Sequence, residues 1–290
     1  MSAERCQRTT TTLFFGVGTG RCGTMTLANA LSAEVGVTCT HEGKLRDYET
    51  PRDQLLPFMT LENRLAYERP EDAEDLWTRA RGDFAAVAAR LDGTHFGDIA
   101  YNYAPFVAQI GAHLPEARLL VFFRNGIDFV RSATQAVGED SAPVGWPPLG
   151  KALSAVERYV GLGRLAPRGN DILAPRWGLL DHVARNAWLW AETNRLILDG
   201  VAGRPPETTL VVRYEDFFSN PIASYRSLRE FLGIRGEPTS QALERLSRPI
   251  NRRADKIIGP HASWTEEQRS AFRDLAGPTM QRLGYALPPP

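Results

Sequence analysis

Short apolar runs alternate with amphipathic stretches along most of this chain. Four hydrophobic runs have the length of buried strands, and a fifth is weaker. They are Thr12–Val17, His95–Ala100, Arg118–Phe123 and Thr209–Arg213, with Val37–Thr40 as the weaker candidate. Between them, apolar residues recur at helical spacing. The predicted helices are Thr24–Ala33, Asp72–Leu91, Ala104–His113, Ile127–Val137, Leu180–Leu198, Pro221–Phe231 and Glu266–Leu283.

Strands that alternate with helices predict a three-layer α/β fold, with a central, mainly parallel sheet flanked by helices. Ligands of such folds bind beyond the carboxyl ends of the strands. No repeat, low-complexity segment or linker divides the sequence, so we expect a single domain over residues 1–290, with residues 1–11 flexible. Two irregular stretches, Ala136–Gly150 and Leu165–Gly178, are rich in Pro, Gly and Trp. They predict loops that either shape a substrate pocket or cap the core.

The loop after the first predicted strand has the composition of a phosphate-binding turn. Residues 16–26 read Gly-Val-Gly-Thr-Gly-Arg-Cys-Gly-Thr-Met-Thr and lead into a predicted helix. Glycines let backbone N–H groups approach an anion, and the helix N-terminus adds a favourable dipole. The P-loop of nucleoside-triphosphate enzymes ends in Gly-Lys followed by Ser or Thr. Here Thr24 follows Gly23 and Arg21 is the only cation of the loop, so we expect a phosphate ligand other than the usual magnesium complex of ATP.

Composition narrows the choice of partners. The chain has 290 residues with 34 basic and 34 acidic side chains, so no overall charge favours nucleic acid or an anionic membrane. Cys6, Cys22 and Cys39 are odd in number and unpatterned, which fits a reducing cytoplasm. No segment approaches the roughly 18 apolar residues of a membrane span. We therefore expect a soluble, cytoplasmic protein without a membrane or nucleic-acid partner, and the sequence does not indicate its oligomeric state.

A second candidate for anion binding follows the strand Arg118–Phe123. Arg124 leaves the strand end, Asn125-Gly126 opens the next helix, and Ser132 lies eight residues beyond Arg124. An arginine at a strand end and a hydroxyl about two helical turns later can converge on one phosphate. Alone, Arg124 is typical of a surface residue at a strand end. In the same fold as a phosphate-binding loop, it indicates a second phosphate site.

In these motifs the chain resembles the sulfotransferases that use 3′-phosphoadenosine 5′-phosphosulfate (PAPS). Arg21-Cys22-Gly23-Thr24 is similar to the family's loop for the 5′-phosphosulfate, and Arg124 with Ser132 is similar to its 3′-phosphate pair. Further similar segments are Val212–Phe217, Arg229–Ile234, Arg248–Asn251 and Arg282–Tyr285, of which the last two look most like the tyrosylprotein sulfotransferase branch. The likeness is thin over Lys44–Leu91 and Gly138–Gly178. It implies the P-loop-like α/β fold of the sulfotransferases.

The resemblance also implies roles for individual residues. Arg21 would stabilise charge on the leaving phosphate. It would not act as a general acid, because a guanidinium does not release its proton at neutral pH. Arg124 and Ser132 would hold the 3′-phosphate. The cradle of the 5′-phosphate would consist of Cys22, Gly23, Thr24, Met25 and Thr26, and the basic segment that closes over the nucleotide would contain Asn251, Arg252, Arg253 and Lys256. Direct transfer needs no covalent intermediate, so we expect no nucleophilic role for Cys22. We also expect no metal site.

The reaction needs a base that accepts the proton of the acceptor. Thr40-His41-Glu42-Gly43 stands at the expected end of a short strand, facing the site. In the tyrosylprotein branch, the catalytic glutamate follows the loop arginine by the same interval that separates Arg21 from Glu42. A carboxylate near Arg21 tends to stay ionised and can accept a proton. Glu42 is therefore the favoured base, and His41 is its rival.

Three other titratable residues are weaker candidates. His95 and Asp98, on the next predicted strand, are third choices for the base; a histidine there is more typical of a structural residue, and Asp98 could instead bind the acceptor. His182 belongs to an apolar helix that also contains Trp188 and Trp190, so we expect it in the core.

These features together predict a metal-free sulfotransferase that modifies a hydroxyl, or less readily an amine, of a small-molecule or natural-product acceptor in a bacterium. One alternative is a P-loop kinase-like phosphotransferase that uses ATP. Another is a catalytically silent member that keeps the nucleotide site. The sequence does not identify the acceptor, because the two segments expected to bind it are the least similar to the family.

Overall fold

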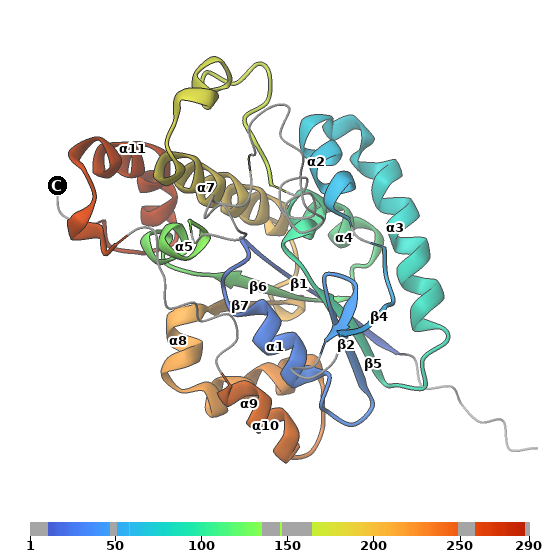
Figure 1. Ribbon diagram of the computed structural model, residues 1–290. Helices are drawn as coiled ribbons and strands as arrows, with labels where there is room; N and C mark the ends of the chain where they lie inside the picture. The colour runs from blue at the N-terminus through green and yellow to red at the C-terminus, as the bar shows by residue number, and fades with distance from the viewer. Residues whose placement is uncertain are drawn as a thin grey trace, which may run out of the picture.

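The computed structural model describes residues 11–46, 51–57, 59–134, 146, 164–248 and 259–287. Its centre is a seven-stranded sheet with the strand order β4-β3-β2-β5-β1-β6-β7 (Figure 1). Five strands run parallel: β1 (Thr12–Gly18), β2 (Val37–His41), β5 (His95–Ile99), β6 (Arg118–Phe123) and β7 (Thr209–Arg213). Two antiparallel strands extend one edge: β3 (Lys44–Arg46) and β4 (Pro51–Gln54). The predicted α/β fold with a mainly parallel sheet is confirmed.

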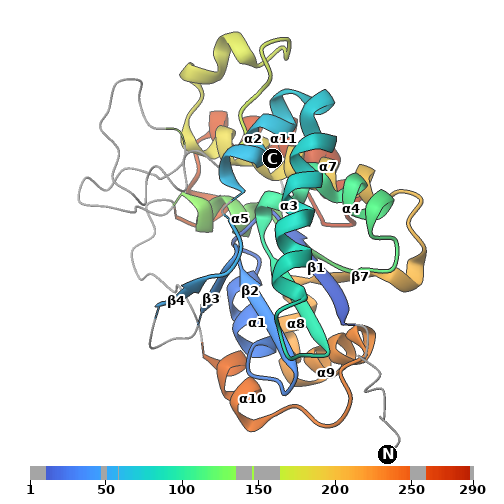
Figure 2. The same ribbon diagram turned by 90° about the vertical axis from the view of Figure 1, so that its right-hand side faces the viewer.

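Helices cover both faces of the sheet, as Figure 2 shows. One layer contains α1 (Thr24–Leu31), α8 (Tyr214–Ser219), α9 (Pro221–Leu232) and α10 (Ser240–Ser247). The other contains α2 (Thr60–Glu68), α3 (Ala73–Ala88), α4 (Val107–His113), α5 (Gly126–Ala133), α7 (His182–Val201) and α11 (Glu266–Arg282). Short 3-10 helices are η1 (Pro70–Asp72), η2 (Tyr101–Phe106), η3 (Ala174–Leu179), η4 (Pro206–Thr208) and η5 (His261–Ser263).

The central strands bury side chains on both faces, which is why they appear in the sequence as continuous apolar runs. In β1, Phe15 packs into the layer that contains α7, and Phe14 packs into the layer that contains α1. Val121 and Leu120 alternate in the same way in β6. The strands therefore anchor both layers, and the loops at their carboxyl ends are held by a fully packed core.

A buried ion pair joins three segments of the α1 layer. Arg229 Nε lies 3.0 Å from Glu34 Oε1, and the two side chains are 4% and 2% exposed. Tyr225 Oη donates to the same carboxylate oxygen at 3.0 Å, and the backbone N–H of Thr239 donates to Glu34 Oε2 at 3.3 Å. The Arg229 guanidinium also donates to the Gly236 carbonyl at 2.8 Å. These contacts tie the end of α1 to α9 and to the segment before α10.

The substitution Glu34→Ala is expected to lower the free energy of unfolding by about 3–5 kcal/mol, because the charge of Arg229 would remain buried without an anion. Urea titration followed by circular dichroism measures this loss. Glu237→Ala is the matched control, since Glu237 forms an exposed pair with Arg226. It should cost no more than about 1 kcal/mol. Equal losses in the two variants would contradict a special role for the buried pair.

Candidate active site

The loop between β1 and α1 turns sharply at the carboxyl end of the central strand. Gly20, Arg21 and Gly23 have backbone φ angles of 73°, 55° and 82°. A Cβ at Gly23 would lie 2.7 Å from the ring of Phe218, so glycine is required there by both space and conformation. α1 begins at the next residue, Thr24. The loop thus delivers Arg21 and the first turn of α1 to one place.

Arg21, Arg124 and Ser132 meet beside this loop, although the sequence assigns Arg21 to one phosphate and the other two to a second. Arg21 Nε donates to Ser132 Oγ at 3.0 Å, and Arg124 Nη1 donates to the backbone carbonyl of Arg21 at 2.5 Å. The guanidinium of Arg124 stacks on Tyr214, with 4.2 Å between its central carbon and the ring centre. Arg124 Nε is buried without a hydrogen-bond partner in the described part of the chain. The result is a basic site with donor capacity that the fold leaves unused.

Helices from both layers hold the turn that carries Arg124. The carbonyl of Arg124 accepts a hydrogen bond from Trp190 Nε1 of α7 at 2.9 Å. The backbone N–H of Asn125 donates to Glu215 Oε1 of α8 at 2.8 Å. Asn125 Oδ1 caps α5 by accepting from the N–H of Ile127 at 2.9 Å. Because its neighbours are fixed on both sides, Arg124 leaves β6 in a defined direction.

Glu42 and Gly43 form a two-residue turn between β2 and β3. His41 pairs with Lys44 across the turn, and the φ angles of Glu42 and Gly43 are 54° and 76°. Positive φ at both positions is typical of a type I′ hairpin, where Asn or Asp usually precedes Gly. A side chain other than glycine costs roughly 1–2 kcal/mol in this conformation. Glu42 and Arg21 are the only non-glycine residues with positive φ in the described part of the chain, and such strain is concentrated at functional sites.

A buried carboxylate, that of Asp98, supports the Glu42 turn. Asp98 Oδ1 accepts from the N–H of Gly43 at 2.9 Å and from Thr40 Oγ1 at 2.6 Å, while Oδ2 accepts from Tyr103 Oη at 2.8 Å. Burial raises the pKa of Asp98, and these hydrogen bonds partly offset that rise. Asp98 is 2% exposed, and both oxygens are used inside the fold. We therefore interpret Asp98 as a residue that positions the turn, in place of the base or acceptor contact considered from sequence.

The substitution Asp98→Asn is expected to lower turnover by roughly 10- to 100-fold, since a displacement of about 1 Å at a reacting group has effects of this size. The Michaelis constant for the expected phosphate-bearing donor should not change, because none of the three hydrogen-bond partners of Asp98 belongs to the phosphate-binding loop. Steady-state kinetics of the transfer reaction expected from the sequence gives both values. Tyr103→Phe is the control that keeps the bonds to Gly43 and Thr40, and it should retain most of the turnover. A parallel loss in both variants would contradict the positioning role.

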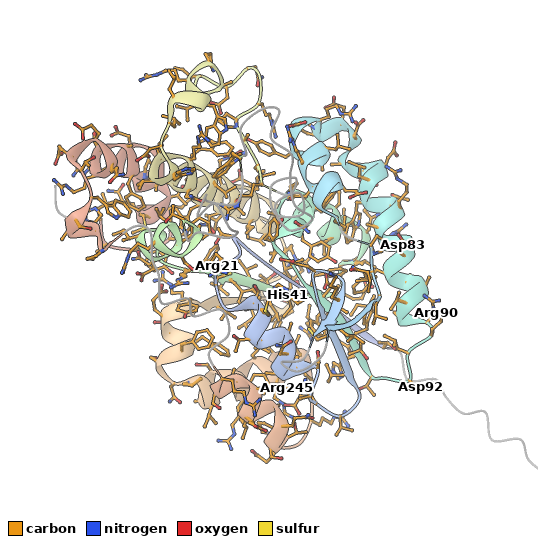
Figure 3. All side chains as sticks on the ribbon, in the orientation of Figure 1. Arg21, His41, Asp83, Arg90, Asp92 and Arg245 are labelled. Atoms are coloured by element: carbon orange, nitrogen blue, oxygen red, sulfur yellow. The ribbon has the colours of Figure 1, made fainter. Side chains whose placement is uncertain are left out.

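His41, the rival base, lies at the end of β2 against the first residue of α1. Its Nε2 is 3.2 Å from Thr24 Oγ1, and the residue is buried. Figure 3 labels Arg21 and His41 near the start of α1. This contact brings the end of β2, and with it Glu42, beside the Arg21 loop. Both candidate bases therefore lie at the carboxyl ends of the parallel strands, where Arg21 also lies.

His95 and Cys22 lie where they have no direct part in catalysis. His95 is the first residue of β5, so it lies at the opposite end of the strand from the site, and its Nε2 contacts the Leu232 carbonyl at 3.0 Å. Cys22 is buried, and burial raises the pKa of its thiol to about 12. The thiol is therefore protonated at neutral pH, which argues against a nucleophilic role.

The remaining predicted site residues divide into two groups. Met25 and Thr26 lie in the first turn of α1, directly after Thr24. Asn251, Arg252, Arg253 and Lys256 lie outside the described residues.

Within the described ranges, no group of three or more His, Cys, Asp and Glu side chains is arranged to hold a metal ion. None of the helices described has both the length and the apolar character needed to cross a membrane.

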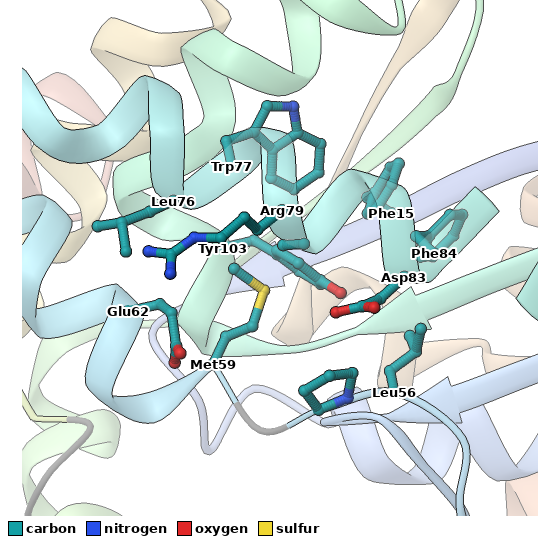
Figure 4. A pocket seen from close by; sticks show the side chains of 12 residues that line it. Phe15, Leu56, Met59, Glu62, Leu76, Trp77, Arg79, Asp83, Phe84 and Tyr103 are labelled. Atoms are coloured by element: carbon teal, nitrogen blue, oxygen red, sulfur yellow. The ribbon is translucent and has the colours of Figure 1, made fainter. Parts of the chain in front are cut away.

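A cavity of about 230 Å³ lies beside α2, α3 and β1 (Figure 4). Its apolar side chains include Phe15, Met59, Trp77 and Phe84, and its charged ones are Glu62, Arg79 and Asp83. Two more lining residues connect it to the Glu42 turn. The N–H of Leu56 donates to the Gly43 carbonyl at 3.1 Å, and Tyr103 donates to Asp98. All its lining residues except Phe15 and Tyr103 belong to the segment 44–91, where the sequence predicts acceptor specificity.

No protein-family model matches this chain, and no curated protein is similar to it in sequence. Solved structures do match it. The sulfotransferase domain from the Synechococcus PCC 7002 olefin synthase has a TM-score of 0.51 and 16% identity, over 99% of this chain and 100% of that one. The sulfotransferase domain from the curacin biosynthetic pathway has a TM-score of 0.50 and 16% identity, over 96% and 99%. The chain therefore has the sulfotransferase fold, along nearly its whole length.

Proposed function

We propose that this protein is a sulfotransferase that transfers the sulfuryl group of PAPS to a hydroxyl of a small-molecule acceptor. The observation that carries the proposal is the meeting of Arg21, Arg124 and Ser132 at the glycine-rich loop, with Glu42 held beside it. These residues come from four separate segments, and the two with potential catalytic roles, Arg21 and Glu42, have strained backbones. The sulfotransferase fold supports the same function.

The residues present fit a donor with two separate phosphate groups. The Arg21 loop and the first turn of α1 would hold the 5′-phosphosulfate, because backbone N–H groups at a helix start bind oxyanions. Arg124 and Ser132 would hold the 3′-phosphate. The unused Nε of Arg124 supports this assignment, since a buried guanidinium nitrogen normally has an acceptor. No loop lysine is present for the phosphates of ATP.

In the proposed reaction, the acceptor oxygen bonds to sulfur while the bond between sulfur and the donor phosphate oxygen breaks. Glu42 accepts the proton of the hydroxyl. Arg21 stabilises the negative charge on the departing phosphate, a kind of stabilisation that is often the largest contribution to catalysis. The phosphate-binding loop, together with Arg124 and Ser132, holds the donor in line with the acceptor oxygen. The products are the sulfated acceptor and 3′-phosphoadenosine 5′-phosphate (PAP).

Calorimetric titration tests the nucleotide assignment. We expect PAP to bind without magnesium, and Arg124→Gln to weaken PAP binding roughly 10- to 100-fold, as expected for a lost charged hydrogen bond. Binding of ATP that requires magnesium, with no binding of PAP, would instead support a kinase-like phosphotransferase. Incubation with radiolabelled PAPS and a panel of hydroxyl compounds then separates an active enzyme from a silent nucleotide-binding member.

A further inference from the structure

Arg164 carries a half-buried positive charge that has only neutral partners. Its Nη1 donates to Asn186 Oδ1 at 2.6 Å, and its central carbon lies 5.3 Å from the ring centre of Trp146. Within the described part of the chain, no carboxylate forms an ion pair with it. Burial, together with the nearby charge of Arg21, lowers the pKa of Arg164 to about 10. Two guanidinium groups that lie near each other are stabilised when an anion binds between them.

Two buried polar atoms lie close to Arg164 and have no hydrogen-bond partner among the described residues. They are Tyr101 Oη and His182 Nδ1. The pKa of Tyr101 is raised mainly by burial and further by Glu42, while Arg164 lowers it, so the phenol lies near both charges. Burial lowers the pKa of His182, the charges of Arg185 and, more weakly, Arg164 lower it further, and Asp181 raises it. Since buried polar atoms are nearly always hydrogen-bonded, these two atoms indicate a polar ligand.

Arg164, Tyr101 and His182, here called the Arg164 cluster, reach this place from different elements. Tyr101 begins η2, two residues after the end of β5. His182 begins α7, and its carbonyl accepts from Asn186 Nδ2 at 2.8 Å, which links it to the partner of Arg164. Tyr101 also lies beside the phosphate-binding loop, because a Cβ at Gly20 would be 3.9 Å from Tyr101 Cβ. The cluster therefore borders the site that contains Arg21 and Glu42.

We propose that the Arg164 cluster binds a carboxylate of the acceptor, so that the substrates of this sulfotransferase are hydroxy acids. A guanidinium matches a carboxylate with two parallel hydrogen bonds. The Tyr101 hydroxyl and the neutral imidazole of His182 supply further donors to the same group. The hydroxyl of the acceptor would then face Glu42, whose charge acts on Tyr101. This inference rests on the proposed sulfuryl transfer.

The sulfuryl group of the donor also carries anionic oxygens, so it is a second candidate for the ligand of the Arg164 cluster. Calorimetry with PAP and with PAPS distinguishes the two sources in wild type and Arg164→Gln. A carboxylate site predicts that the variant binds both nucleotides with wild-type affinity. If affinity for PAPS falls roughly tenfold or more while affinity for PAP is unchanged, the cluster binds the donor and the proposal is wrong.

Matched acceptors test the carboxylate directly. We would compare para-hydroxyphenylacetate and beta-hydroxybutyrate with their carboxamides, by transfer from radiolabelled PAPS and by ligand-observed NMR on the PAP-loaded protein. For wild type, at least one acid should bind or react roughly 10- to 100-fold better than its amide, the range expected for charged hydrogen bonds. Arg164→Gln should remove this preference, and Arg164→Lys should restore part of it.

Arg118→Gln is the matched control for these measurements. Arg118 is also an arginine stacked on an aromatic ring, 5.3 Å from the ring centre of Phe231, and it is the first residue of β6, at the opposite end of that strand from the site. It should keep the preference for acids. If wild type treats acids and amides alike in both binding and transfer, the carboxylate site is excluded. That result differs from a failure of the proposed function, in which PAP itself would not bind.

Discussion

Arg21→Gly is expected to lower sulfuryl transfer by roughly 100- to 1000-fold, the loss typical of removing one donor that stabilises developing charge. The protein should unfold at nearly the wild-type temperature. Arg21 has a φ of 55°, a conformation that glycine adopts without strain, so the substitution removes the guanidinium and relieves the backbone together. Radiolabel transfer measures the rate, and thermal unfolding measures the stability.

Two further variants make this result specific. Arg21→Lys keeps a positive charge but loses the planar fork, so we expect an intermediate rate. Arg226→Ala removes an exposed arginine far along the sequence and should leave the rate unchanged. If Arg21→Gly retains a rate close to that of wild type, Arg21 does not stabilise the leaving phosphate.

Glu42→Asn should give the second large effect, with activity and stability changing in opposite directions. Asn-Gly is the preferred pair for a type I′ turn, so the free energy of unfolding should rise by about 1 kcal/mol. Loss of the carboxylate should lower the rate by roughly 100- to 10,000-fold, the usual contribution of a general base. Glu42→Gln separates the two effects, because it removes the charge without changing the preference of the backbone.

The affinity for PAP should be unchanged in both Glu42 variants, since the base does not contact the nucleotide in the proposed mechanism. Calorimetry provides this check. His41→Ala is the decisive comparison between the two candidate bases. If His41→Ala abolishes transfer and Glu42→Gln leaves it intact, the base is His41, and the strain at Glu42 needs another explanation.

The sequence predicts the sheet well because its central strands are buried on both sides. Runs such as Arg118–Phe123 have few alternatives to a buried parallel strand, and β6 has these same bounds. The edge strands β3 and β4 were missed, since they have only three and four residues and little apolar character. The predicted helix Ala104–His113 begins as the 3-10 helix η2, which contains Pro105.

The placement of Arg21 and Arg124 after neighbouring parallel strands was predictable, because each follows a buried apolar run. The Arg164 cluster was not. Arg164 stands directly before the irregular stretch Leu165–Gly178, and Tyr101 falls between a predicted strand and a predicted helix. His182 was expected in the core, but it starts α7 and is only half-buried, because Asp181 caps the helix there. No local pattern reports contacts between such distant segments.

The left-handed backbone of Glu42 could not be read from the sequence either. A Glu-Gly pair does not have the turn preference of Asn-Gly. The conformation of this hairpin turn therefore depends on the hydrogen bond from Gly43 to Asp98 and on the pairing of β2 with β3. The buried side chain of Asp98 is equally hard to assign from the sequence, where an acidic residue near a site resembles a catalytic group. Its role becomes evident only from its three hydrogen-bond partners.

The helix α7 fixes the distance between two parts of the site. Asn186 holds Arg164 at one turn of α7, and Trp190 holds the carbonyl of Arg124 at the next. Four residues of an α-helix advance by about 6 Å. Because α7 is packed into the core along most of its length, this spacing is set before any ligand binds. The acid-binding cluster and the nucleotide site would then stand at a fixed separation, so acceptors would be selected by length as well as by charge.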